Sequence, residues 1–401
     1  MSDKLFYKGK FGLERETLRV DINGRLAQTP HPFTEDGNIT RDFCENQIEL
    51  ITPVCNSVDE VMDELDKLDS KVRNKITKNG ESIWLYSNPP HFDSEDEIPV
   101  ANFTGEHTGK RIYREQLSRR YGKKLMLFSG IHFNFSFDDE YLKTLYNGPD
   151  FDFWRDEFYL SLYKKLSLNS WLLLLLTAAS PVCDRSLLGE AADGTTESGY
   201  SSIRSGDKGY WNDEIPILDH RNLKSFVDSI QSYVDSGKLF SASELYFPVR
   251  LKPKGINHID NFKNGISHIE LRMFDLNPLT KLGIDKRDLE FAHLLIMYLS
   301  AQPDFEYTSD LQKRAVINHK NAALYDLSDV KIDNENIIDR AQSKLCEMAD
   351  FFCKDDEAAK IIEFEIQKLT NRLCEQITNI YRQKVTKCAS FSGCLHTEKQ
   401  T

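Results

Sequence analysis

Polar and apolar residues alternate with a period of two along several short stretches of the chain, which predicts strands. These stretches cover residues 12–20, 47–53, 83–86, 130–137, 245–251 and 266–275. Between them, apolar residues recur every three or four positions, as in amphipathic helices. Strands mixed with long helices, without regular strand–helix–strand alternation, favour an α+β fold with a mainly antiparallel sheet.

The clearest helical pattern lies in residues 58–76, where the apolar positions form one stripe. Ser57 followed by Glu60 has the spacing of a capping box at its start. The longest apolar run, Trp171 to Ala179, is far shorter than the roughly 20 residues that span a bilayer. It therefore predicts a buried helix.

The same patterns divide the rest of the chain. One or two helices are predicted at residues 151–179, another at 287–300, and a charged helical region from about residue 333. Loops are expected at residues 88–100, 189–211 and 303–318.

The polar face of four predicted strands carries unusual side chains, and the opposite face of each is expected to be fully apolar. The polar positions are Glu14 and Glu16 in the first strand, Glu49 in the second, His132, Asn134 and Ser136 in the third, and His268, Glu270 and Arg272 in the fourth. Two interpretations remain open here. The face meets solvent, as many antiparallel sheets do, or it binds a cation.

The carboxylates are an argument for the cation, although the spacing alone still favours a solvated face. They suit strands poorly, and like charges two residues apart on one face repel unless positive charge lies between them. Oxygen ligands with one imidazole suit Mg²⁺ or Mn²⁺.

Charge and motifs exclude several classes. The 401 residues hold 51 Lys and Arg against 63 Asp and Glu, a net charge of −12, which argues against a nucleic-acid or anionic-membrane partner. No P-loop, G-x-G-x-x-G, G-x-S-x-G or H-E-x-x-H motif is present. The eight cysteines lack zinc spacing, and the start of the chain lacks a signal-peptide pattern, so a cytoplasmic protein with reduced thiols is expected. A disulfide between Cys388 and Cys394 stays open as an alternative to two free thiols.

Two further segments have alternative interpretations. Residues 110–124 hold seven Lys or Arg, which would suit either an oxyanion clamp or a basic solvated helix. Residues 184–211 are rich in Gly, Ser and Thr and include Arg204, Tyr210 and Trp211. That segment would be either a loop that covers a substrate or a plain surface loop.

The chain also resembles a known family. Gly12-Leu13-Glu14-Arg15-Glu16-Thr17-Leu18-Arg19-Val20 is similar to the opening motif of bacterial glutamate–cysteine ligases. Seven further blocks match in order over roughly residues 9 to 300: Asp42-Phe43 with Glu49-Leu50-Ile51-Thr52-Pro53; Tyr113-Arg114-Glu115 with Arg120-Tyr121-Gly122; Ser129 to Ser136; Ala179-Ser180-Pro181; Ser202-Ile203-Arg204 with Gly209-Tyr210; Glu244-Leu245-Tyr246 with Pro248 and Arg250; and Ile269-Glu270-Leu271-Arg272 with Asp275-Leu276-Asn277-Pro278.

The resemblance implies a fold like that of the glutamine synthetase superfamily, in which helices pack behind a curved antiparallel sheet. It implies ATP as co-substrate, Mg²⁺ or Mn²⁺ as cofactor, and L-glutamate and L-cysteine as substrates of the first step of glutathione biosynthesis. The implied metal ligands are Glu14, Glu16, Asp42, Glu49, His132 and Glu270. Arg272 and Glu270 carry the implied catalytic roles, Arg272 by contacting the transferred phosphoryl group. The residues implied to contact amino acids are Tyr113, Arg114, Arg204 and Tyr210.

Two departures from the family pattern qualify this expectation. Met126 stands where close relatives are expected to have glutamine, so a ligase on the same scaffold with another amine or acid remains an alternative. A second alternative is a non-catalytic metal- or nucleotide-binding relative. The family resemblance is weak after about residue 330, so residues 1–330 are expected to form the catalytic domain and residues 331–401 a helical region packed on it.

Overall fold

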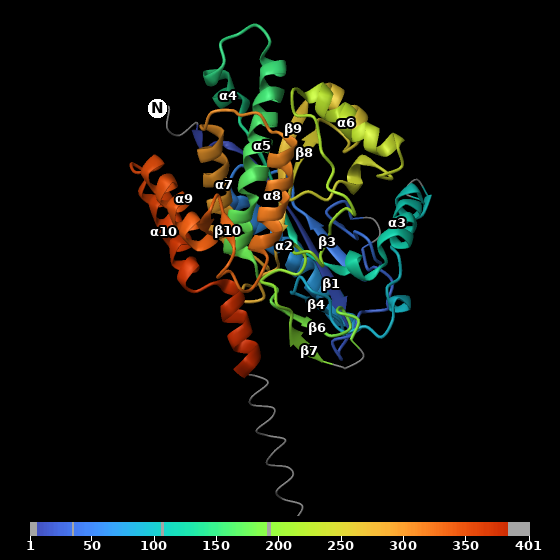
Figure 1. The fold of residues 1–401 in the computed structure, drawn as a ribbon. Helices are drawn as coiled ribbons and strands as arrows, with labels where there is room; N and C mark the ends of the chain where they lie inside the picture. Colours follow the sequence, from blue (N-terminus) through green and yellow to red (C-terminus); the bar gives the residue numbers. More distant parts are fainter. Residues whose placement is uncertain (1–5, 34–35, 106–107, 191–193, 384–401) are drawn as a thin grey trace, which may run out of the picture.

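The computed structural model describes residues 6–33, 36–105, 108–190 and 194–383. Its centre is a seven-stranded sheet with the strand order β2-β3-β1-β5-β9-β8, in which β4 also pairs with β1 (Figure 1). All of its pairings are antiparallel. The strands are β1 (Gly9–Val20), β2 (Ile39–Thr40), β3 (Gln47–Ile51), β4 (Ser82–Trp84), β5 (Ile131–Phe137), β8 (Val249–Pro253) and β9 (Ile266–Phe274). The α+β prediction with an antiparallel sheet is confirmed.

One face of this sheet is covered by α2 (Val58–Ile76), α5 (Phe151–Thr177) and α7 (Lys286–Ser300). In Figure 1, α7, α5 and α8 (Ser309–Ala322) run side by side in front of the sheet. The helix α9 (Ile337–Phe351) and the helix α10 (Asp356–Thr370) lie outside α7, while α3 (Thr108–Tyr121) and α6 (Leu223–Asp235) occupy the opposite flank. The smaller elements are α4 (Asp139–Leu145), β6 (Val182–Asp184), β7 (Thr195–Glu197), β10 (Lys331–Ile332) and β11 (Glu335–Asn336).

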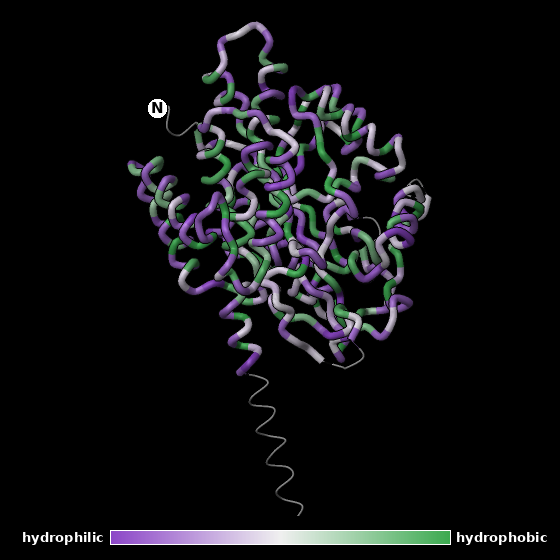
Figure 2. Tube along the Cα trace, in the orientation of Figure 1, coloured by the Kyte–Doolittle hydropathy of each residue, from purple (hydrophilic) through white to green (hydrophobic). Residues whose placement is uncertain are grey.

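The long apolar run forms part of a single 27-residue helix, α5, whose residues from Ser170 to Thr177 are all buried. Hydrophobic segments lie mainly in the interior of the trace in Figure 2, where α5 and α7 pack against the sheet. Within the described ranges, no helix is long and apolar enough to cross a membrane.

The start of α2 shows how a local signal becomes structure. Ser57 Oγ accepts a hydrogen bond from Glu60 N at 3.1 Å, as the capping pattern predicts. Glu60 Oε2 accepts from the backbone N–H of Asn56 at 2.8 Å, one residue earlier than in a regular capping box. Both bonds fix the entry of α2 beneath the sheet.

Three sequence expectations are wrong. The loop expected at residues 303–318 contains most of α8, which Thr308 caps and which buries Ala315 and Val316. The strand expected at residues 245–251 begins only at Val249, because a 3-10 turn (Ala242–Glu244) and Pro248, which has no N–H to donate, precede it. The back face of β1 is not fully apolar, because it buries Arg15.

The helices after residue 330 share one hydrophobic core with the sheet, through residues such as Leu345 and Ile362. Lys368 Nζ on α10 lies 2.6 Å from Asp288 Oδ1 on α7 and 3.0 Å from Glu365 Oε2. The division at residue 330 remains a proposal. Cys388 and Cys394 lie outside the described residues.

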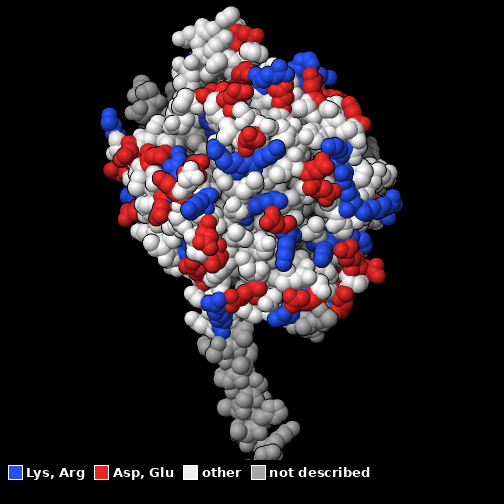
Figure 3. Space-filling view, viewed as in Figure 1, with Lys and Arg blue, Asp and Glu red and all other residues white. Residues whose placement is uncertain are grey.

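The viewed surface carries acidic and basic side chains interspersed with one another, without a large field of one sign (Figure 3). The polar chemistry of interest lies instead on the face of the sheet that α2 and α5 leave uncovered.

Candidate active site

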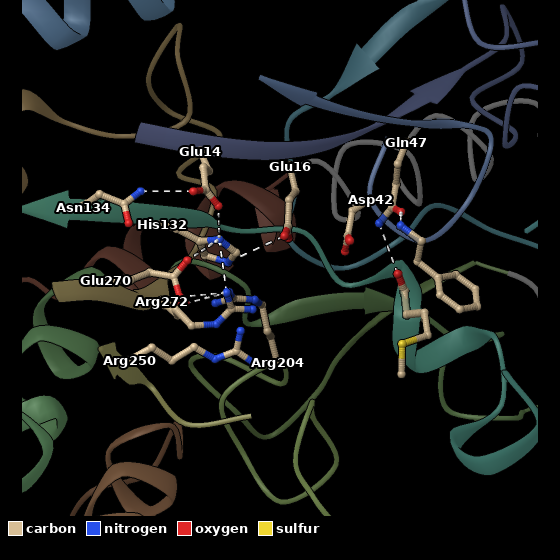
Figure 4. Close-up of polar contacts among 12 residues, drawn as sticks. Glu14, Glu16, Asp42, Gln47, His132, Asn134, Arg204, Arg250, Glu270 and Arg272 are labelled. Atoms are coloured by element: carbon tan, nitrogen blue, oxygen red, sulfur yellow. Dashed lines mark hydrogen bonds and ion pairs between the residues drawn. The ribbon is translucent and has the colours of Figure 1, made fainter. Parts of the chain in front are cut away.

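Strand register brings the predicted acidic residues together on one face of the sheet. Glu14 on β1 lies opposite His132 on β5, and Glu16 on β1 lies opposite Glu49 on β3. Glu270 reaches the same place from β9 (Figure 4). Five of the six predicted metal ligands therefore come from four adjacent strands, as the period-two pattern indicated.

The centre of this group is formed by Glu14, His132 and Glu270, which each offer one ligand atom within 4.8 Å of the others. His132 Nδ1 lies 3.2 Å from Glu14 Oε2 and 3.8 Å from Glu270 Oε1. His132 Nε2 is buried, makes no hydrogen bond to a described residue, and lies 3.6 Å from Glu16 Oε1. Buried and half-buried carboxylates around an imidazole with an unpaired nitrogen form a donor set that fits a divalent cation.

Glu49 and Glu16, farther along this face, have too little positive charge nearby to offset their burial. Burial and the nearby charges of Asp42, Glu14 and Glu16 raise the pKa of Glu49 well above its ordinary value. Burial also raises the pKa of Glu16. A bound cation would favour the ionised forms of both groups, because positive charge stabilises carboxylates.

Asp42 lies apart from the central group, beyond Glu16 in Figure 4, with 42% of its side chain exposed. Its carboxylate is 3.6 Å from Arg114 Nη2, and its backbone oxygen accepts a hydrogen bond from Arg114 Nε. The structure thus brings Asp42 to the rim of the acidic group and Arg114 next to it.

The neighbouring part of the face is basic. Arg272 Nη1 lies 3.2 Å from Glu270 Oε2, and Lys252 Nζ on β8 lies 2.9 Å from Glu270 Oε1. Burial alone would raise the pKa of Glu270, but Lys252, Arg272 and His132 outweigh burial and hold it well below its ordinary value. Glu270 therefore stays ionised between the acidic and the basic halves of the site.

Two more arginines complete the basic half. Arg204 Nη2 donates to the backbone oxygen of Arg272 at 2.7 Å, and its guanidinium lies over Gly130, where an added Cβ would come within 2.5 Å of it. Arg250 donates to the backbone oxygens of Leu245 and Ser243 at 2.8 and 2.7 Å. Positive charge held this way suits a phosphate or carboxylate ligand.

Sequence reasoning missed Lys252 as a site residue and assigned Arg250 no role. Their signal was present, because Arg250 and Lys252 are two residues apart on a strand and so share a face. A 380 Å³ cavity borders both residues, and a 340 Å³ cavity borders Glu14 and Asn134.

Tyrosines border the arginines. The rings of Tyr210 and Tyr246 lie 4.1 Å apart, and burial raises the pKa values of Tyr210 and Tyr113, so both hydroxyls stay protonated. A 40 Å³ cavity is lined by Arg204, Tyr210, Tyr246, Arg272 and His319, among others. The four predicted amino-acid contacts thus lie on two segments, Tyr113 and Arg114 on α3, and Arg204 and Tyr210 on the loop after β7.

Most of the basic stretch, residues 110–124, lies in the helix α3, in which only Leu117 is buried. Arg114 stacks over Phe103 at 4.8 Å and reaches Asp42, whereas Arg120 pairs with the buried Glu244 at 3.1 Å. Part of this helix is therefore solvated and part of it faces the site.

Comparison with known proteins identifies the family of the chain. The family model described as glutamate-cysteine ligase matches residues 1–240 and 235–322. A bifunctional glutathione biosynthesis protein of Listeria monocytogenes is 35% identical over 96% of this chain and 53% of its own length. A glutamate–cysteine ligase of Clostridium acetobutylicum is 30% identical over 94% of both chains. The chain spans about half the length of the bifunctional relatives that it matches.

Two solved structures share the fold. The bifunctional glutathione synthetase from Pasteurella multocida has a TM-score of 0.83 and 26% identity, over 95% of this chain and 51% of that one. The glutamate–cysteine ligase from Francisella tularensis, solved in complex with AMP, has a TM-score of 0.84 and 25% identity, over 94% and 85%. The chain belongs to the glutamate–cysteine ligase family.

Proposed function

We propose that this protein is an ATP-dependent ligase that joins the γ-carboxylate of L-glutamate to the amine of L-cysteine, the first step of glutathione biosynthesis. The observation that carries the proposal is the meeting of Glu14, His132 and Glu270 with Arg272 on one sheet face of a chain in this family. An acidic half that suits cations next to a basic half that suits phosphate is the arrangement that phosphoryl transfer requires.

The proposed reaction has two steps. An oxygen of the glutamate γ-carboxylate attacks the γ-phosphorus of ATP, which gives γ-glutamyl phosphate and releases ADP. The cysteine nitrogen then attacks the acyl carbon and gives up a proton to solvent, and phosphate leaves. Neither step needs a protein nucleophile, because positioning and charge neutralisation lower the barrier.

Each half of the site has a role in this scheme. Glu14, Glu16, Asp42, Glu49, His132 and Glu270 would hold Mg²⁺ or Mn²⁺, which supplies positive charge to the phosphate oxygens when bound. Arg272 would neutralise charge on the transferring phosphoryl group, since Arg binds oxyanions in a forked geometry. The residues proposed to hold the amino acids are Tyr113, Arg114, Arg204 and Tyr210.

The experiment that tests this function measures ADP release with ATP, Mg²⁺ and L-glutamate, and then adds single amines. L-cysteine should stimulate release more strongly than any other amino acid. Stimulation by another amine but not by cysteine would reject cysteine as the substrate. Binding of Mg·ATP without turnover with any amine would instead favour a non-catalytic relative.

A second candidate is a ligase of the same chemistry that uses another amine or acid. Met126 motivates it, because it stands where the family pattern is expected to have glutamine, and its side chain is buried in the apolar cluster against which Tyr113 and Tyr210 pack. If Met126 sets amine selectivity, Met126→Gln will change the KM for the amine several-fold and leave the KM for ATP within about twofold. Equal changes in both values would argue for a general disturbance of the fold.

The proposal also places the protein in the cytoplasm, with small molecules rather than nucleic acid or membranes as partners. The described cysteines are consistent with this placement, because Cys44, Cys55, Cys183, Cys346, Cys353 and Cys374 are all free thiols.

A further inference from the structure

Lys252 occupies a distinctive position between the two halves of the site. It lies on β8, at the edge of the sheet, opposite His268 on β9. Its ammonium is 2.9 Å from Oε1 of Glu270, whose side chain is fully buried, and only 12% of the Lys252 side chain is exposed. Lys252 is therefore the direct counter-ion of this buried carboxylate oxygen.

Glu270 Oε1, the oxygen that Lys252 contacts, also faces the acidic half of the site. Glu270 Oε2 is engaged by Arg272 at 3.2 Å, whereas Oε1 lies 3.8 Å from His132 Nδ1. A divalent cation held by Glu14, His132 and Glu270 would share Oε1 with the ammonium of Lys252. Two positive groups at such short range repel strongly, so the ammonium and the cation compete for this oxygen.

A cavity next to Lys252 offers its ammonium a second position. It borders the 380 Å³ cavity, whose lining also includes Arg250, Ser241 and His258. A lysine ammonium ends a flexible four-carbon chain and readily changes partners. Arg250 is held in place by two backbone oxygens. The cavity is therefore bordered by one fixed positive side chain, Arg250, and one movable positive side chain, Lys252.

We propose that Lys252 exchanges partners, neutralising Glu270 in the free protein and binding a phosphate oxygen of the nucleotide once a divalent cation occupies the Glu270 oxygen. This inference rests on the proposed function for the identity of the nucleotide. Its consequence is coupling, because the cation releases the lysine that the phosphate needs, and each ligand therefore strengthens binding of the other.

The test measures binding instead of turnover, on the full chain. Mn²⁺ affinity is measured by electron paramagnetic resonance without nucleotide, and ADP affinity by calorimetry at saturating Mn²⁺. Lys252→Met should bind Mn²⁺ at least threefold more tightly than the unmodified protein and ADP at least tenfold more weakly. Lys252→Arg should recover part of the ADP affinity. If the Met variant does not fold, Lys252→Gln serves the same measurement.

Lys254→Met is the matched control, because Lys254 lies two residues further along, is partly exposed and pairs with Asp152 at 3.6 Å, away from Glu270. It should leave both affinities unchanged. Unchanged or weaker Mn²⁺ binding in Lys252→Met, or unchanged ADP binding, would overturn the exchange. Absence of amine-stimulated turnover with both binding changes intact would overturn only the proposed function.

Discussion

Arg15 Nη2 lies 2.6 Å from Asp69 Oδ1, and both side chains are fully buried. This ion pair joins β1 to α2 on the face of the sheet opposite to Glu14 and Glu16. Arg15 also donates to the backbone oxygen of Leu282 at 3.2 Å, so one guanidinium connects three segments directly beneath the proposed active site.

Asp69→Asn should destabilise the protein by about 3–5 kcal/mol, because it leaves the buried charge of Arg15 without its counter-ion. The free energy of unfolding in urea measures this loss. Glu64→Gln is the control, since Glu64 pairs with the exposed Lys67, and exposed pairs contribute far less to stability than buried ones. Equal losses in the two variants would contradict a structural role for the buried pair.

The period-two pattern could predict Glu14, Glu16 and Glu270 as site residues because strand geometry alone puts alternate residues on one face. It could not place Asp42, which lies in a loop and reaches the site through tertiary contacts. Nor could it predict that Arg15 is buried, because its counter-ion Asp69 is 54 residues away in sequence.

The helix α8 was missed for a related reason. Its polar residues Gln312 and His319 are buried by tertiary partners, so its sequence does not show a clean apolar stripe. The role of Lys252 likewise depends on a contact with Glu270 across two paired strands, which alternation along β8 does not reveal.

Gln47 should position the loop that carries Asp42. Its Oε1 accepts from the backbone N–H groups of Phe43 and Cys44 at 2.7 and 2.8 Å, and its Nε2 donates to the backbone oxygen of Met126 at 3.1 Å (Figure 4). Gln47→Leu leaves two N–H groups unpaired, at about 1–3 kcal/mol each.

We expect Gln47→Leu to lower Mn²⁺ affinity several-fold and to raise the KM for the amine, with a smaller effect on the KM for ATP. Gln47→Glu keeps the acceptor for both N–H groups and should recover part of the Mn²⁺ affinity. If Gln47→Leu binds Mn²⁺ as tightly as the unmodified protein, Gln47 does not position Asp42 for metal binding.

His293 should make the protein sensitive to acid. It is buried among Phe11, Phe135 and Tyr7, and burial lowers its pKa from 6.5 to about 3. As the pH falls below 6.5, His293 binds a proton in the unfolded chain but stays neutral in the folded protein. The stability that the neutral imidazole contributes is therefore complete above pH 6.5 and is lost toward pH 3.

His293→Leu should reduce the decline in unfolding free energy over this range by up to about 1.4 kcal/mol per pH unit. Urea unfolding at several pH values measures this slope. His258→Asn is the control, because His258 is exposed and Asn also caps a helical turn. A slope in His293→Leu as steep as that of the control would show that His293 does not titrate on unfolding.

Glu14 and Glu270 are the pair on which the metal assignment depends most, because each offers an oxygen close to His132. Replacing both by Gln keeps their size and removes the two negative charges that would hold the cation. The double variant should bind Mn²⁺ at least 100-fold more weakly. Its free energy of unfolding is measured alongside, because Glu270→Gln also removes the buried counter-ion of Lys252 and Arg272.

The most direct test of the account quantifies γ-glutamylcysteine and ADP by mass spectrometry after incubation with ATP, Mg²⁺, L-glutamate and L-cysteine. The unmodified protein should form the two products in equal amounts, and the folded Glu14→Gln/Glu270→Gln variant should form neither. Absence of γ-glutamylcysteine with the unmodified protein, or its formation by the double variant at an undiminished rate, would contradict the account.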